Sequence, residues 1–256
     1  MQRIIKKLHH GGADSACQHI IDTYNSRWKA CINYVYWAQI VKYNLFDDQS
    51  QSDYKTCVNN SDLLLPDGIA LKTWRRVARL LWYHHYPLLH NLNGTDFLPY
   101  FLQYCEKLWF DIVLYWWYTQ DQKAIKEYCT KITPLRIVAQ YEWYTDLVLP
   151  HKKNCILIQS RWWVQEYRCN THDYDGYIVF NQWWTFDFWA GKNTRSPKRA
   201  SSWLWKKFWD ILSQRWAEAV WRLIDDPKKN TMKFFSWFQI IIDICQLFIW
   251  KFAKKT

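Results

Sequence analysis

The sequence predicts a mainly α-helical fold that carries one long β-hairpin. Apolar residues recur at helical spacing through most of residues 1–150. Between 151 and 191 the chain changes to two runs rich in Ile, Val, Tyr, Phe and Trp, which flank the turn dipeptide Asp175-Gly176. Beyond residue 191 the apolar spacing is helical again. We therefore expect a helical body (1–150), a β-hairpin (151–191) and a basic, Trp-rich two-helix C-terminal unit (192–256).

Residues that typically start or end helices divide the body into segments. Ser15 and Gln18 match a capping box, in which two side chains satisfy free backbone amides at the start of a helix. Pro87 and Pro150 end helical segments, because proline lacks a backbone amide hydrogen and clashes with the preceding turn. The Thr133-Pro134 pair fits a cap followed by proline at the first helical position. The expected helices cover about 16–43, 68–86, 97–119, 121–132 and 134–148.

The strands of the expected hairpin lie within Cys155–Cys169 and Tyr177–Trp189. A hairpin cannot stand alone in water, so it must pack on the helices or on a partner sheet. Two further helices are expected over about 201–224 and 233–253. The first has an apolar stripe, whereas the second is nearly all apolar apart from one narrow polar stripe.

Composition excludes several classes of enzyme. The chain holds only six glycines, and it contains neither of the glycine-rich phosphate-binding loops nor a G-x-S-x-G nucleophile motif. Eight scattered cysteines without a secretory signal indicate reduced thiols in an intracellular compartment. The basic start of the chain faintly resembles an organelle transit peptide, so an organelle is an alternative location.

Basic charge is concentrated near the C-terminus. Residues 192–256 carry +9 of the formal net charge of +11, and they hold seven of the 20 tryptophans. Most of this excess lies outside the two expected helices, at 192–199, 228–233 and 251–255. Lysine and arginine attract phosphate backbones, and bases stack on aromatic rings. The expected contacts with RNA or another polyanion are Arg195, Lys198, Arg199, Lys228, Lys229, Lys233, Trp203 and Trp221.

A zinc site is the strongest metal candidate, although we expect no metal and no cofactor. His151 and Cys155 are followed by Cys169 and His172 with zinc-like local spacing. If residues 155–169 form one strand, its ends lie roughly 45 Å apart, which forbids a shared ion. The acids Asp173 and Asp175 are expected to build the hairpin turn rather than a calcium loop.

The catalytic sequence patterns in this chain occur no more often than chance predicts. Arg79 and His84 match the Arg-x4–6-His pattern of helical HEPN ribonucleases, but about one such match is expected in a chain of this composition. The remaining histidine groups, among them His9, His10 and His19 near Cys17, show no ligand or triad spacing.

The last expected helix raises a membrane alternative. Residues 234–250 are just long enough to cross a bilayer, with Trp237 and Trp250 placed like interface anchors. Asp243 lies at the centre of this segment and costs about 2.5–3.5 kcal/mol on insertion scales.

These observations favour a non-catalytic structural subunit of a larger protein complex, in which basic connectors contact RNA or another polyanion. A ribonucleoprotein or an organellar complex would fit. The first alternative is an accessory subunit of a membrane complex that is anchored by 233–253. The second alternative is a helical ribonuclease that uses Arg79 and His84.

Overall fold

The chain divides into two units, residues 1–193 and residues 194–256. The structure is a computed structural model, and all of the residues that it describes lie in the first unit. The described residues are 7–36, 40, 53–68, 71–72, 75–76, 88–116, 121–142, 149–150, 153–160, 174–181 and 185–191.

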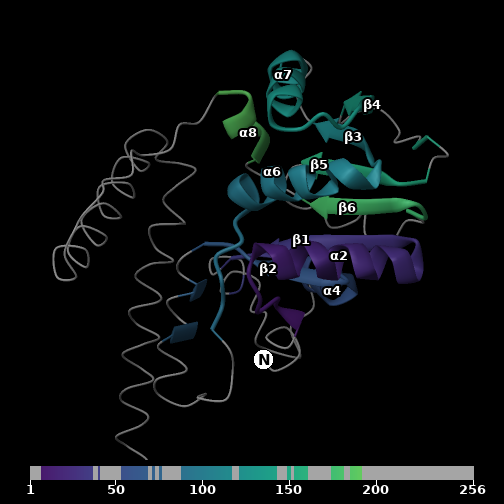
Figure 1. The fold of residues 1–256 in the computed structure, drawn as a ribbon. Helices are drawn as coiled ribbons and strands as arrows, with labels where there is room; N and C mark the ends of the chain where they lie inside the picture. Colours follow the sequence, from purple (N-terminus) through teal and green to yellow (C-terminus); the bar gives the residue numbers. More distant parts are fainter. Residues whose placement is uncertain are drawn as a thin grey trace, which may run out of the picture. The chain divides into compact units, whose positions relative to one another are not determined.

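A six-stranded sheet, parallel in every pairing, forms the centre of the described unit (Figure 1). The strand order is β2-β1-β6-β5-β3-β4, so the first and last strands along the chain are neighbours in the middle. The strands are β1 (Lys29–Val35), β2 (Leu63–Pro66), β3 (Asp111–Trp116), β4 (Ile137–Glu142), β5 (Cys155–Ser160) and β6 (Tyr177–Asn181). Leu8, which belongs to no strand, forms an isolated parallel bridge with Leu64 of β2.

Helices lie between most of the strands, as parallel pairing requires. A parallel strand must be reached by a crossover long enough to return the chain to the starting edge of the sheet. The described helices are α2 (Ala13–Arg27), α4 (Asp53–Asn60), α6 (Gly94–Tyr104), the 3-10 helix η1 (Cys105–Leu108), α7 (Gln122–Ile132) and α8 (Thr185–Trp189).

One face of the sheet packs on α2, α6, α7 and α8, and we call it the helix-packed face. Ile32, Ile112, Ile156, Ile158 and Ile178 project from it into one apolar cluster with residues of these helices. All five of these isoleucines are fully buried. Full burial of each such side chain is worth about 1.5–3 kcal/mol. Burial of this cluster therefore supplies the main apolar driving force for packing the helices on the helix-packed face of the sheet.

The opposite face carries the alternate residues of the same strands, and we call it the amide face. Val113, Leu157 and Val179 form a second apolar cluster there, with Tyr174 and Tyr177. Asn33, Gln159 and Asn181 lie on the same face, because they share the two-residue period of those strands. The chain after α4 also reaches this face, since Ser61 bonds the side chain of Asn33.

The prediction of a mainly α-helical fold is wrong, because a parallel sheet organises the described unit. The expected helix 16–43 ends at Arg27 and is followed by β1, and the expected helix 97–119 ends at Tyr104 before η1 and β3. The segment expected as helix 134–148 begins with β4. The helix expected over 121–132 does form, as α7.

The error has a physical cause. Central strands of a parallel sheet are buried on both faces, so they lack the alternation of apolar and polar residues that identifies a half-buried strand. In β1 and β5 nearly every side chain is buried, and such short apolar runs also satisfy a helical template.

The predicted hairpin is also wrong. The two segments do pair as β5 and β6, but the pairing is parallel, with Cys155 opposite Tyr177 and Gln159 opposite Asn181. A turn is present at Asp175-Gly176, where Gly176 has φ +88°. It leads into β6 and does not join two antiparallel strands. The segment 185–189, expected as strand, forms α8.

Two tryptophans occupy backbone positions that favour glycine. Trp28 follows α2 with φ +58°, and Trp109 follows η1 with φ +56°. Helices commonly end in this left-handed conformation, and glycine is preferred there because it has no Cβ to clash with the carbonyl oxygen. Trp109 is 88% exposed, so burial offers little compensation. The chain has 20 Trp and only six Gly, so tryptophan stands at two positions where glycine would be less strained.

We therefore expect Trp109→Gly to stabilise the protein. Relief of the left-handed strain, less the greater entropy of unfolded glycine, leaves a net gain of roughly 0.5–1 kcal/mol in the free energy of unfolding. Chemical denaturation measures the change. Leu108→Gly, one residue earlier and inside η1, is the matched control and should destabilise. A Trp109→Gly protein no more stable than the wild type would contradict the strain argument.

Candidate functional site

The carboxyl ends of β1 and β6 mark a reversal in the winding of the sheet. The chain leaves β1 through α4 to reach β2 at one edge. It leaves β6 towards the other side, because α8 packs against α6 and α7. In open parallel sheets, ligands bind outside the carboxyl ends of the strands where adjacent connections diverge in this way. This position is therefore the first place to look for a site.

A row of buried amide side chains crosses the sheet at this position. The Asn181 side-chain nitrogen donates to Oδ1 of Asn33 over 2.8 Å, and the Asn33 nitrogen donates to Oγ of Ser61 over 2.6 Å. Gln159 in turn donates its amide hydrogen to Oδ1 of Asn181. The Ser61 hydroxyl ends the row by donating to the carbonyl of Cys57 over 2.8 Å. We call Gln159, Asn181, Asn33 and Ser61 the amide row.

The amide row is directional, and its first member keeps a free acceptor. Every bond runs the same way, from Gln159 towards Cys57. Gln159 is fully buried, and its Oε1 has no hydrogen-bond partner among the described residues. A buried acceptor without a partner costs roughly 1–3 kcal/mol. The row therefore presents one polar atom that requires a donor.

Strand register continues the row towards the far edge of the sheet. Tyr115 of β3 lies opposite Gln159, and Tyr141 of β4 lies opposite Tyr115. On the other side of the row, Asn33 lies opposite Leu64 of β2. Amide and phenol side chains thus succeed one another across five strands on one face, close to where each strand ends.

A tyrosine of α2 fixes the opposite, amino edge of the same strands. The Tyr24 hydroxyl accepts from the Asn154 backbone amide over 2.9 Å and donates to the Gly176 carbonyl over 3.2 Å. These two residues precede β5 and β6. Burial raises the pKa of Tyr24, so this side chain stays a neutral donor and acceptor. The amino edge is thereby held by structural bonds, which leaves the carboxyl edge for a ligand.

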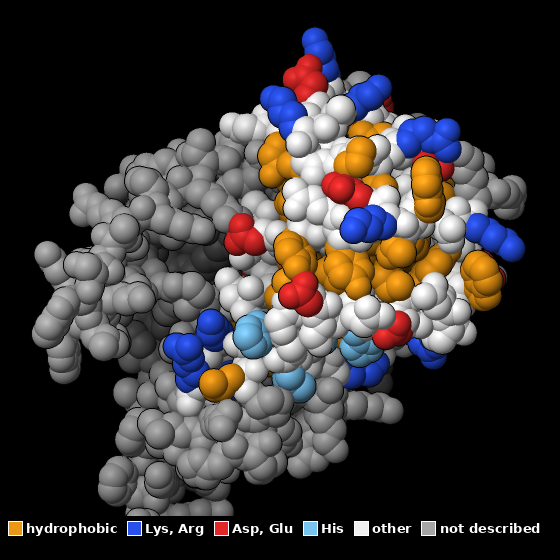
Figure 2. Space-filling view, viewed as in Figure 1, with side chains coloured by type: hydrophobic (Ala, Val, Ile, Leu, Met, Phe, Trp, Pro, Cys, Tyr) orange, Lys and Arg blue, Asp and Glu red, His pale blue; other side chains and the backbone are white. Residues whose placement is uncertain are grey.

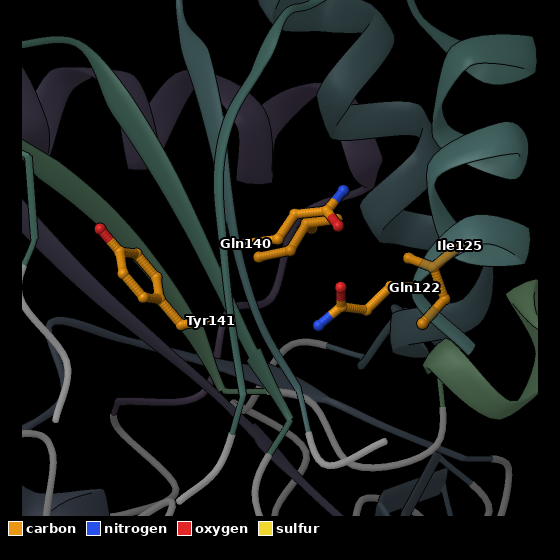
Figure 3. Close-up of a pocket in the computed structure, with 5 residues that line it drawn as sticks. Gln122, Ile125, Gln140 and Tyr141 are labelled. Carbon is orange, nitrogen blue, oxygen red and sulfur yellow. The ribbon is translucent and has the colours of Figure 1, made fainter. Parts of the chain in front are cut away.

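A small hollow lies on the helix-packed side of β4 (Figure 3). It is lined by Leu114, Gln122, Ile125, Gln140 and Tyr141. Figure 3 shows Gln122 of α7 and Gln140 of β4 turned towards one gap, with Tyr141 on the other side of the strand. The hollow lies at the sheet edge, away from the winding reversal, and is the weaker candidate.

Three buried thiols are poor nucleophiles. Burial raises the pKa of Cys17 and of Cys129 to about 12, and it raises that of Cys105 as well. A thiol must lose its proton to attack a substrate, so these groups are inert near neutral pH.

The residues predicted to contact a polyanion all lie outside the described part of the chain. They are Arg195, Lys198, Arg199, Lys228, Lys229, Lys233, Trp203 and Trp221. The same holds for Arg79 and His84, and for the segment 233–253. Across the described ranges, no helix has both the length and the apolar character needed to cross a membrane.

The predicted zinc ligands are only partly described. Cys155 is fully buried as the first residue of β5, whereas His151, Cys169 and His172 lie outside the described residues. Among the residues that are described, no group of three or more His, Cys, Asp or Glu could hold a metal ion. Asp175 pairs with Lys29 at 3.1 Å in the turn before β6.

No protein family matches the chain, and no curated protein is significantly similar to it. The site must therefore be judged on its own geometry.

Sequence reasoning missed the amide row, although a signal was present. Asn33, Gln159 and Asn181 each interrupt a short run of otherwise apolar residues near its end. An isolated amide in a buried strand needs a partner, because an unpaired amide is costly inside a protein. Three such interruptions would have indicated neighbouring strands, had the runs been identified as strands.

We expect Asn181→Ala to lower the free energy of unfolding by about 2–3 kcal/mol. The substitution leaves the Gln159 amide hydrogen and Oδ1 of Asn33 without partners inside the sheet. Urea denaturation measures the loss. Asn25→Ala, at an exposed position of α2, is the matched control and should change stability by less than about 0.5 kcal/mol. Equal effects of the two substitutions would contradict the existence of the row.

Proposed function

We propose that this chain is an α/β ligand-binding protein that holds a small polar metabolite at the carboxyl ends of β1, β6 and β5. The observation that carries the proposal is the amide row at the winding reversal of the sheet. Parallel α/β sheets with this feature bind ligands at that edge, and many are enzymes.

The chemistry of the row favours a neutral ligand that carries hydroxyl or amide groups. The described members of the row are amides and a hydroxyl, which form neutral hydrogen bonds. Oε1 of Gln159 requires a donor, and a sugar hydroxyl or a base N–H supplies one. Tyr115 and Tyr141 follow the row in register, and aromatic rings suit the flat faces of sugars and bases. A sugar or a nucleoside fits these requirements.

Gln159→Met tests this proposal. The substitution keeps the length of the side chain but removes the free acceptor, so affinity for the ligand should fall roughly tenfold or more. Thermal unfolding is measured against a panel of free sugars, nucleosides and nucleotides, followed by calorimetric titration of any compound that stabilises the wild type.

Gln140→Met is the matched control, because Gln140 lies on the edge strand β4 and lines the hollow on the other face. It should bind like the wild type. Failure of every compound to stabilise the protein, or an equal loss of affinity in both variants, would refute the proposed site.

Contact with a polyanion remains a second proposal, as part of an assembly role for the C-terminal unit. Residues 192–256 carry +9 of the net charge of +11, and this concentration supports an anionic partner such as RNA. No disulfide joins the six described cysteines, which supports a reducing compartment. Membrane anchoring by 233–253 and ribonuclease chemistry at Arg79 and His84 stay as weaker proposals.

The polyanion proposal predicts RNA binding that weakens with salt. Exchange of Lys228 and Lys229 to glutamine should lower the affinity and reduce the slope of log affinity against log salt by up to about 2. Fluorescence anisotropy at several salt concentrations measures both quantities. Exchange of Lys126 and Lys131, exposed on α7, is the control. Binding that ignores both salt and the Lys228 and Lys229 exchange would exclude this role.

A further inference from the structure

We propose that the start of α2 is a phosphate-binding site, formed by His9, Ser15 and the free backbone amides of the first helical turn. The site lies outside β2 at the edge of the sheet and is separate from the amide row. Its ligand is a phosphate dianion, either free or as the phosphoryl group of a larger molecule.

The chain enters α2 from an isolated β-bridge through a short loop. Leu8 bridges to Leu64, and the His9 backbone amide donates to the Leu64 carbonyl over 2.8 Å. The chain then turns at Gly11-Gly12 and starts the 15-residue helix α2. A glycine turn that leads into a helix start directs backbone N–H groups at an anion.

The helix start has no side-chain cap. Gly12 is the N-cap residue, and no side chain bonds the first-turn amides there. Those amides and the positive end of the helix dipole favour an anion. A helix start alone would not define a site, because water satisfies most of them.

The second observation is the buried face of His9. Its side chain is only 8% exposed, and Nε2 is buried without a hydrogen-bond partner among the described residues. Nε2 lies 2.7 Å from the position that a Cβ on Gly11 would take, and Ser15 Oγ lies closer still. The imidazole, the hydroxyl and the glycine turn therefore meet at one point, and glycine is required there because a Cβ would clash with both side chains.

The surroundings of His9 are basic. The His19 ring of α2 lies 5.8 Å from the His9 ring, and His10 and His90 also oppose a charge on His9. Arg75, itself buried, opposes a charge on His10. The Gly12 backbone alone favours the charged form of His9. Histidine side chains are grouped on the face seen in Figure 2, below the apolar surface of the helices.

The acid in the first turn of the helix is engaged elsewhere. Asp14 accepts a hydrogen bond from the Tyr100 hydroxyl of α6. That bond raises the pKa of Tyr100, so the phenol keeps its proton and continues to donate. The carboxylate is thus held by α6.

Binding of an anion is coupled to protonation. Burial is the largest cause that lowers the pKa of His9 in the free protein, and the neighbouring histidines lower it further. A bound anion favours the imidazolium, so it raises the same pKa, and affinity for an anion of fixed charge must increase as pH falls through that range. A histidine that merely fills the core would show no such coupling.

The test is calorimetric titration of the full chain with inorganic phosphate, glycerol phosphate and sulfate at about pH 6 and about pH 8. Sulfate keeps its charge across this range, so a pH effect on sulfate reports the protein. For sulfate we expect saturable binding that is at least about fivefold tighter at the lower pH. If glycerol phosphate binds and inorganic phosphate does not, the ligand is the phosphoryl group of a larger molecule.

Variants locate the site. His9→Gln and Ser15→Ala should each weaken binding by about tenfold, because each removes a hydrogen bond to a charged ligand. Ser26→Ala, at the other end of α2 and bonded to the Thr23 carbonyl, is the matched control and should leave affinity unchanged. Circular dichroism confirms that each variant is folded. Absence of saturable binding, or binding that both site variants leave intact, would overturn the proposal.

Discussion

The pairing of β1, β6 and β5 at the centre of the sheet is the constraint on which the rest of the described structure depends. These strands come from opposite ends of the unit, and each is buried on both faces. Their register places Asn33, Asn181 and Gln159 side by side, so the buried amides satisfy one another. A slip of one residue would turn the amides into the helix-packed cluster and expose isoleucines to the other face. The amide row therefore helps to specify the register as well as to form the candidate site.

The division of labour between the two edges of the sheet follows from the same arrangement. At the amino edge, Tyr24 ties α2 to the residues that precede β5 and β6. At the carboxyl edge, connections leave β1 and β6 in opposite directions, and the amide row begins at Gln159 with an unsatisfied acceptor. Rigid support at one edge and unsatisfied polar groups at the other are what a ligand site needs, because the supporting bonds do not have to move when a ligand binds.

Local features of the sequence were sufficient for a few elements only. The α7 helix was predictable because it has a polar face and an apolar face, and the Asp175-Gly176 turn was predictable from its glycine. The strands were not, since β1 and β5 are apolar on both faces and mimic helical segments. The site was missed for the same reason: Asn33, Gln159 and Asn181 are distant in sequence and meet only through parallel pairing. The scarcity of glycine also hid two helix ends, because Trp28 and Trp109 occupy left-handed positions where glycine is usual.

Hydrogen exchange of side-chain amides tests the central claim most directly. If Asn33 and Asn181 donate within a buried row, their side-chain N–H groups should exchange only through large-scale unfolding, as slowly as the backbone amides of β1 and β6. Nuclear magnetic resonance of the labelled protein resolves these groups individually. Exchange of the Asn33 and Asn181 side chains as fast as that of the exposed Asn25 would contradict the account.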